Sequence, residues 1–212
     1  MTLLLRRGFA AFLLGIVLVA GIGVGAARAD DAADAADAQN FIRAMADKAL
    51  VLVNDKTISD KERVERFRTL FIASFDIPEI GKFVLGRHWK TATPEQQQDF
   101  IKSFEDFTVL TWSTRFKDYS GVSFDLEGAS PAGDGYYIVD LQIKRSQGEP
   151  LPLGWRVHKV DGTWKVTDIL VEGVSMALTQ RQDFAAAMQS SGGKIEDLLA
   201  AMHKKIDQLK GS

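Results

Sequence analysis

The 212-residue chain carries 26 basic and 28 acidic side chains, and it contains no cysteine. Nucleic-acid binders need clustered positive charge, so this balance disfavours that class of protein. The absence of cysteine excludes disulfides, zinc–thiolate sites and iron–sulfur clusters, so a hydrophobic core must hold the fold, and the chain is long enough for one.

The N-terminus has the pattern of a secretory signal peptide. Two arginines precede an apolar run over residues 8–27, and the sequence Ala-Arg-Ala that ends at Ala29 fits the small-x-small cleavage rule. We therefore predict a signal peptide over residues 1–29, cleaved after Ala29, and one exported domain over residues 30–212. The run is also about long enough to span a bilayer, so an uncleaved membrane anchor is the alternative.

The first half of this domain is predicted to be helical. Apolar residues recur at helical spacing over residues 39–53. Three further helices carry capping signals. These signals are Ser59 with Glu62, Asp76 before a short helix over residues 77–85, and Thr93 with Gln96 before a helix that runs to about residue 119.

The apolar period changes to two in the second half, and turn residues separate the alternating segments. Strands are predicted over residues 122–126, 137–143, 153–157 and 164–170, followed by helices over 174–190 and 194–209. Short turns between successive strands indicate an antiparallel meander. We predict an α+β fold, in which helices pack on one face of a curved antiparallel sheet of about four strands.

Two charged side chains lie on faces that their apolar neighbours would bury. Asp168 follows the alternation of a strand, and Arg181 lies among apolar residues at helix spacing. Because an unpaired buried charge is unfavourable, we expect Asp168 to pair with Arg181, or Glu172 to share Arg181. Such a structural ion pair would orient the last part of the chain against the sheet. The alternative is an Arg181 that faces a cavity and binds an anionic group of a ligand.

A serine between a strand and a helix raises the possibility of a hydrolase. The sequence Gly-Val-Ser that ends at Ser175 has the context of a nucleophile elbow, but only His203 follows it. We predict that Ser175 starts a helix, and an exported serine esterase stays as an alternative hypothesis. His88, His158 and His203 are far apart and form no close-spaced ligand pair, so we predict no metal site. The sequence contains no P-loop or H-E-x-x-H pattern, so we predict no cofactor and no other catalytic set.

Several blocks of the chain resemble one known family. Phe-Val-Leu-Gly-Arg-His-Trp over residues 83–89 and the Gln-rich start of the next helix are similar to its "vLG-x-x-W" block. Gly162-x-Trp-Lys-Val-x-Asp168, then Val-Glu-Gly-Val-Ser and Arg181-x-x-Phe184, are similar to its second signature. This is the MlaC family, also called toluene-tolerance or organic-solvent-resistance auxiliary proteins. The chain has Trp112 where many relatives have tyrosine.

The resemblance implies a function and partners. Members of this family are periplasmic carriers of phospholipid, whose acyl chains lie in an apolar cavity between sheet and helices. They exchange lipid with the MCE-domain subunit of an inner-membrane ABC transporter and with an outer-membrane lipoprotein–porin complex. A related branch, HpnM, is associated with hopanoids. The resemblance also implies a non-enzymatic protein.

On this hypothesis the lipid pocket lies between the helices and the sheet. Its candidate residues are the aromatic and aliphatic side chains that we expect to face this layer, namely Trp112, Phe116, Tyr137, Val139, Trp155, Val157, Val166 and Met176. A filled core at the same place would instead indicate a ligand-free interaction module. For the docking surface we single out the charges around Lys82, Arg87 and Lys90.

Overall fold

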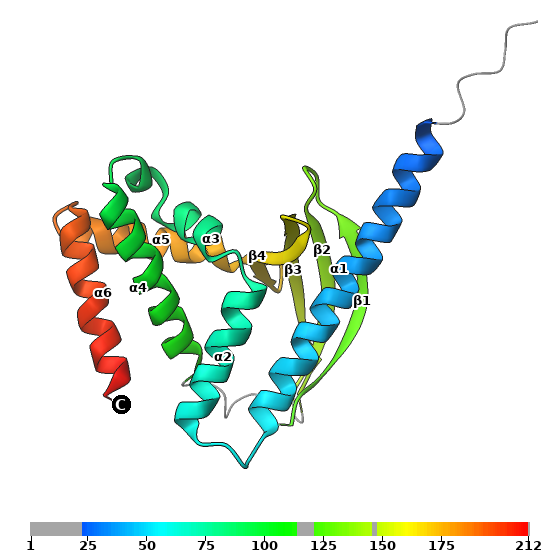
Figure 1. The fold of residues 1–212 in the computed structure, drawn as a ribbon, viewed down its shortest axis with the longest axis horizontal. Helices are drawn as coiled ribbons and strands as arrows, with labels where there is room; N and C mark the ends of the chain where they lie inside the picture. Colours follow the sequence, from blue (N-terminus) through cyan, green and yellow to red (C-terminus); the bar gives the residue numbers. More distant parts are fainter. Residues whose placement is uncertain (1–22, 114–120, 146–147, 212) are drawn as a thin grey trace, which may run out of the picture.

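The computed structural model describes residues 23–113, 121–145 and 148–211 (Figure 1). Its elements are α1 (Gly23–Asn54), α2 (Asp60–Ser74), α3 (Ile77–Leu85), the 3₁₀ helix η1 (Gly86–Lys90), α4 (Pro94–Ser113), β1 (Ser123–Pro131), β2 (Tyr137–Lys144), β3 (Leu151–Val160), β4 (Thr163–Val171), β5 (Val174–Ser175), α5 (Met176–Ser190) and α6 (Ile195–Lys210). This order confirms the predicted α+β fold, with helices first, an antiparallel sheet next and two helices last.

Local capping explains where the middle helices begin. The Ser59 hydroxyl accepts a hydrogen bond from the backbone N–H of Glu62 at 3.2 Å. Thr93 and Gln96 satisfy each other's backbone N–H groups in a reciprocal capping box, at 2.9 and 3.3 Å. Helix α4 is described as far as Ser113, and its predicted end near residue 119 lies outside the described residues.

Helix α1 is longer than the predicted segment over residues 39–53. It begins at Gly23 and runs through a stretch rich in alanine, the strongest helix former. Its buried residues Ala38, Ile42 and Met45 pack on the sheet, which adds tertiary support to that propensity. Cleavage after Ala29 stays a prediction. No helix in the described ranges is long and apolar enough to cross a membrane.

The sheet is a meander in which every strand is antiparallel to its neighbours in sequence, in the order β1-β2-β3-β4-β5. The four predicted strands are confirmed. The fifth, β5, has two residues and pairs with the end of β4 across a tight turn at Glu172 and Gly173, which both have positive φ. Helix α5 therefore begins at Met176, two residues later than predicted, with Ser175 as its N-cap.

Two separate hydrophobic cores hold the molecule. The core of the helical lobe is built from buried residues of α2 to α6, with Phe100, Phe104, Val109 and Leu198 among the most deeply buried. The core of the sheet lobe joins the buried face of α1 to the inner side chains of β2, β3 and β4. Figure 1 shows α2 at the side of the helical lobe that faces the sheet lobe, between α4 and α1. Phe75 packs against both cores.

The connection between α2 and α3 attaches the helical lobe to the sheet. The backbone N–H of Asp76 donates to the carbonyl of Val166 at 2.9 Å, and Phe75 forms a parallel bridge with the same residue. Lys165 adds a hydrogen bond of 2.6 Å from its Nζ to the carbonyl of Ala73, near the end of α2. This junction sets the distance between the two lobes.

Candidate functional site

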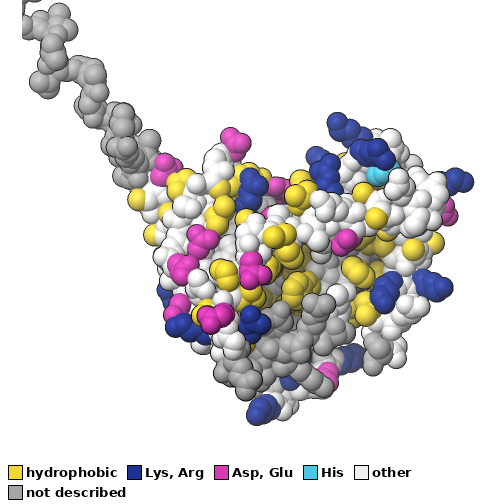
Figure 2. All heavy atoms as spheres, turned by 180° about the vertical axis from the view of Figure 1, so that it is seen from behind, with side chains coloured by type: hydrophobic (Ala, Val, Ile, Leu, Met, Phe, Trp, Pro, Cys, Tyr) yellow, Lys and Arg dark blue, Asp and Glu magenta, His cyan; other side chains and the backbone are white. Residues whose placement is uncertain are grey.

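A hollow opens between the helical lobe and the sheet lobe, and hydrophobic side chains gather in it (Figure 2). We call it the interlobe hollow. Four aromatic rings form a continuous row from α2 to β3 next to the junction of the lobes. Successive centroids of Phe67, Phe71, Phe75 and Trp155 are 6.0, 4.5 and 6.2 Å apart. This aromatic row links the core of the helical lobe to that of the sheet lobe, with Phe71 buried and Trp155 partly buried.

The sequence contained a signal for this row that our candidate list did not use. Phe67, Phe71 and Phe75 recur every four residues, which places the first two on one face of α2. Such spacing predicts a buried stripe, but it does not reveal that the stripe continues onto a strand eighty residues later. Only the fold brings Trp155 to its end.

Trp155 is the predicted pocket residue with the most unusual environment. Its ring is partly buried against the sheet core, and it lies opposite Val139 in the pairing of β2 with β3. Its Nε1–H is fully buried and has no hydrogen-bond partner in the part of the chain that the structure describes. A buried donor without a partner is uncommon in folded proteins, because it loses its hydrogen bonds to water.

The structure separates the other predicted pocket residues into three groups. Tyr137, Val139, Val157 and Val166 are buried together in the core of the sheet lobe, where α1 covers them. Trp112 near the end of α4 and Met176 at the start of α5 are half-buried, on different elements. Phe116 lies outside the described residues. The alternation in the sequence therefore indicated which side chains share the apolar side of the sheet. It did not distinguish the residues that α1 buries on that side from those that stay partly exposed.

Tyr137 also shows how closely α1 covers the sheet. Its hydroxyl donates to the carboxylate of Asp31 on α1 at 3.3 Å, and its ring meets that of Trp164 edge-on at 5.6 Å. Burial, followed by the negative charges of Asp31 and Asp34, raises the pKa of Tyr137 above its ordinary value. The neutral phenol is thus the stable form under α1.

The prediction that Asp168 pairs with Arg181 is wrong, because the Asp168 carboxylate instead caps helix α5. Its Oδ1 accepts from the backbone N–H of Ala177 at 2.9 Å, and its Oδ2 accepts from the hydroxyl of Ser175 at 2.5 Å. Oδ1 also accepts from the N–H of Ile169 at 2.8 Å. A helix N-terminus presents free N–H groups and a partial positive charge, so it satisfies a carboxylate without a cationic side chain.

Arg181 has a different partner from the predicted one. Its guanidinium carbon lies 4.9 Å from the centroid of the Phe83 ring on α3. No ion pair with Asp168 or Glu172 is present among the described residues. Glu172 is exposed in the turn between β4 and β5. Arg181 therefore joins α5 to α3 through a cation–π contact.

Ser175 acts as the helix cap that we predicted. Its hydroxyl accepts from the backbone N–H of Leu178 at 3.0 Å while it donates to Asp168. The only later histidine, His203, lies on α6 and contacts Asp99 of α4 at 2.9 Å. The groups needed for an esterase triad are thus engaged in separate parts of the structure.

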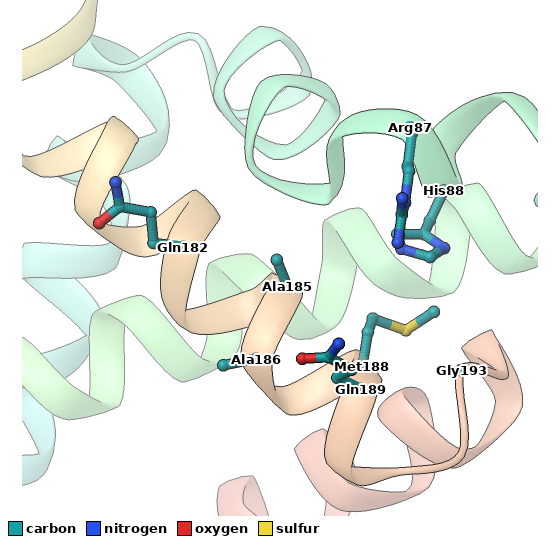
Figure 3. Close-up of a pocket in the computed structure, with 8 residues that line it drawn as sticks. All are labelled: Arg87, His88, Gln182, Ala185, Ala186, Met188, Gln189 and Gly193. Carbon is teal, nitrogen blue, oxygen red and sulfur yellow. The ribbon is translucent and has the colours of Figure 1, made fainter.

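Another depression lies on the helical lobe, between η1 and α5. Its volume is about 420 Å³, and Figure 3 shows Arg87 and His88 of η1 facing Met188 and Gln189 of α5. The rest of its lining consists of Gln182, Ala185, Ala186 and Gly193. Small and polar side chains dominate this surface, so it suits acyl chains less well than the interlobe hollow.

Comparison with known proteins decides the family. The family model described as MlaC protein matches residues 43–204, which is most of the chain. The chain belongs to the MlaC family. The matched range begins inside α1 and ends inside α6, so it contains both lobes and the junction between them.

Two relatives from other bacteria agree with this assignment. The toluene tolerance protein ttg2D of Pseudomonas putida is 22% identical over 136 residues, which cover 64% of this chain and 63% of that protein. The intermembrane phospholipid transport system binding protein MlaC of Haemophilus influenzae is 27% identical over 132 residues, covering 60% and 61%. The match spans less than two thirds of the length of either relative.

The fold also has a solved counterpart. The phospholipid-binding protein from Ralstonia solanacearum, whose structure is of a complex with a phospholipid, superposes with a TM-score of 0.72 and 24% identity. The superposition covers 82% of this chain and 98% of that one. At this identity the likeness shows that the two proteins share a fold.

Proposed function

We propose that this chain is a periplasmic phospholipid carrier that holds acyl chains in the interlobe hollow and moves lipid between the inner and outer membranes. Membership of the MlaC family supports this proposal, as does the similarity to the Haemophilus phospholipid transport protein and to the phospholipid-binding Ralstonia protein. The carrier performs no covalent chemistry. Ser175 has a structural role in it, consistent with its capping contacts.

The observation that carries the proposal is the presence of two separate cores with an apolar hollow between them, in a chain of this family. Each methylene that moves from water into an apolar environment contributes about 0.8 kcal/mol, so a carrier needs a long dry surface rather than polar contacts. The aromatic row of Phe67, Phe71, Phe75 and Trp155 supplies part of such a surface.

Within this proposal the predicted pocket residues take two roles. Trp155, Trp112 and Met176 are half-buried and line the lipid directly. Tyr137, Val139, Val157 and Val166 form the buried layer behind the lining and keep the sheet rigid. Phe116 stays a candidate by sequence alone.

Exchange of lipid requires docking surfaces for the two membrane complexes, the MCE-domain subunit of the inner-membrane transporter and the outer-membrane lipoprotein–porin complex. We place one such surface at Lys82, Arg87 and Lys90, which are all exposed on α3 and η1. A cluster of positive side chains favours a partner with an acidic face and speeds encounter more than it strengthens the complex. Replacing Arg87 with Glu should slow lipid transfer without changing the lipid content of the purified carrier.

Native mass spectrometry of the exported full-length protein tests the carrier function. We expect a fraction of the protein to carry the mass of a phospholipid, which collision activation releases. A bound hopanoid mass would change the lipid class, and a protein that is always ligand-free, even after incubation with phospholipid vesicles, would contradict the proposal.

Two matched variants connect the bound lipid to the hollow. Trp155→Ala should lower the lipid-bound fraction, because it removes one end of the aromatic row. Leu178→Ala removes a large side chain that is 48% exposed on α5, and it should leave the bound fraction unchanged. Equal loss in both variants would place the lipid elsewhere. Ser175→Ala should retain lipid, and labelling of the native protein by a fluorophosphonate would revive the esterase hypothesis.

A further inference from the structure

Two neighbouring carboxylates and one histidine from a distant part of the sequence converge at the junction of the two lobes. Asp76 is the N-cap of α3, Glu79 lies in the first turn of the same helix, and His158 comes from β3. The Nε2 atom of His158 lies 3.1 Å from Oδ2 of Asp76 and 3.3 Å from Oε2 of Glu79. All three donor atoms are within 4.8 Å of one another. This group is separate from the aromatic row of the interlobe hollow.

Each of these three side chains makes a second contact that holds it in place. None of these contacts uses the atom that points toward the other two side chains. Oδ1 of Asp76 accepts from the backbone N–H of Glu79 at 3.0 Å, and Oε1 of Glu79 accepts from the hydroxyl of Tyr136 at 2.7 Å. The His158 ring stacks on the Tyr136 ring, with centroids 4.9 Å apart and planes 4° from parallel. Outer contacts that orient ligands in this way are typical of metal sites.

The two separations from Nε2 of His158 fit a tetrahedral metal ion. Ligands bound at about 2.0–2.1 Å in a tetrahedron are about 3.4 Å apart, close to the two measured separations from Nε2. A neutral imidazole has at most one proton on Nε2 and carries no charge, so it neutralises neither carboxylate. The two negative charges of Asp76 and Glu79 therefore lie close together at the half-buried junction. A divalent cation would satisfy all three groups at once.

We propose that Asp76, Glu79 and His158 form a binding site for one divalent transition-metal ion, with Zn²⁺ as the best fit. One imidazole nitrogen and two carboxylate oxygens suit Zn²⁺, whereas Ca²⁺ takes six to eight oxygen ligands and Mg²⁺ demands an octahedron of oxygens. Glu79, with 39% of its side chain exposed, leaves a path for the ion and a fourth position for water. The sequence did not reveal the site, because His158 follows the two carboxylates by about eighty residues and only the fold brings it to them.

The location gives the ion a structural role. His158 belongs to the sheet lobe, while the two carboxylates belong to α3 of the helical lobe. A bound ion would therefore add a link between the lobes beside the hydrogen bond from Asp76 N–H to Val166. Binding to the folded state alone raises the stability of that state, so the midpoint of unfolding should rise with Zn²⁺ concentration.

Isothermal titration calorimetry of the untagged, chelator-treated full-length protein with Zn²⁺ tests this site directly. We expect one ion per chain, and the intense visible absorption of tetrahedral cobalt when Co²⁺ replaces Zn²⁺. His158→Phe keeps the stacked ring but removes the nitrogen ligand, and Glu79→Gln removes one carboxylate. Each should weaken Zn²⁺ binding by about tenfold or more, a loss typical of disturbed metal sites, and each should abolish the rise of the unfolding midpoint.

His203 provides the matched control. It contacts a single carboxylate, that of Asp99, at an exposed position on the helical lobe. His203→Phe should therefore bind Zn²⁺ like the native protein. The proposal is wrong if the native protein binds no Zn²⁺, or if His158→Phe and His203→Phe bind it with the affinity of the native protein.

Discussion

The guanidinium of Arg181 lies against both the ring of Phe83 and the backbone of Gly86, so α5 is locked to the end of α3. Gly86 has a φ of 62° and a ψ of −128°, a conformation that a residue with a side chain rarely adopts. A Cβ added at Gly86 would lie 3.2 Å from Nε of Arg181.

We predict that Gly86→Ala lowers the free energy of unfolding by about 1–3 kcal/mol, through backbone strain and crowding together. Urea unfolding measures this loss. In an Arg181→Ala background the crowding is gone, so the same glycine substitution should have a smaller effect. An identical effect in both backgrounds would assign the whole loss to the backbone.

Asp168 gives a second prediction, because its carboxylate accepts hydrogen bonds from N–H groups of both β4 and α5. Asp168→Ala leaves the hydroxyl of Ser175 and the N–H of Ala177 without this acceptor. An orphaned, partly buried donor costs about 1–3 kcal/mol, so the free energy of unfolding should fall by that amount. Ser175→Ala removes one cap and should lower it by about 1 kcal/mol. If Asp168→Ala has no effect on the urea midpoint, the cap is unimportant.

Arg68 joins α2 to α4 and supports a third prediction. One of its nitrogens lies 2.7 Å from carboxylate oxygens of both Glu105 and Asp106, and all three side chains are mostly shielded from solvent. Arg68→Met keeps the aliphatic stem but leaves two adjacent negative charges, so we expect a loss of about 1 kcal/mol that high salt reduces.

The matched control for this change is Arg66→Met, which breaks an exposed pair with Glu62 on the same helix. Pairs of that kind contribute about 0.3–0.5 kcal/mol. Thermal unfolding at low and high salt should separate the two variants, and similar losses would contradict a special role for Arg68.

Asp140 provides a prediction for pH. Burial, and then the negative charge of Glu127, raises the pKa of Asp140 above its ordinary value. A carboxyl with a raised pKa is more easily protonated in the folded state, so folding loses stability as pH rises from the unfolded to the folded pKa. Asp140→Asn should therefore raise the unfolding midpoint slightly at pH 7, and this benefit should disappear well below the ordinary aspartate pKa of about 3.9, where Asp140 is protonated in both the folded and the unfolded state. A benefit that is equal at both pH values would exclude charge as the cause.

Local chemistry made the helix starts predictable. Ser59 and Thr93 bond to N–H groups three residues away, so the sequence contains both partners within one turn. The strands were equally accessible, because alternation reports which side of a sheet is buried. Even the short β5 had its signal in the Glu172–Gly173 turn, although we assigned its residues to the helix.

Partnerships across the fold were not predictable in the same way. The apolar neighbours of Asp168 and Arg181 implied that each needed a partner. They did not show that Asp168 would accept from a helix N–H group, or that Arg181 would lie on an aromatic ring. Likewise, alternation placed Val139 and Trp155 on one side of the sheet without showing that α1 covers the first and leaves the second at the aromatic row. Such choices depend on the relative position of the lobes.

The meander has a consequence for the order in which the molecule assembles. The five strands that the structure describes follow one another along the chain and pair with their sequence neighbours, apart from the single bridge of Val166 to Phe75, so most of the sheet can form through short-range closures. The core of the helical lobe is different, since Leu198, Leu199 and Met202 of α6 complete it. During synthesis from the N-terminus this lobe stays incomplete until the sixteen residues of α6 emerge, and in that interval the exposed apolar residues of the lobe favour aggregation.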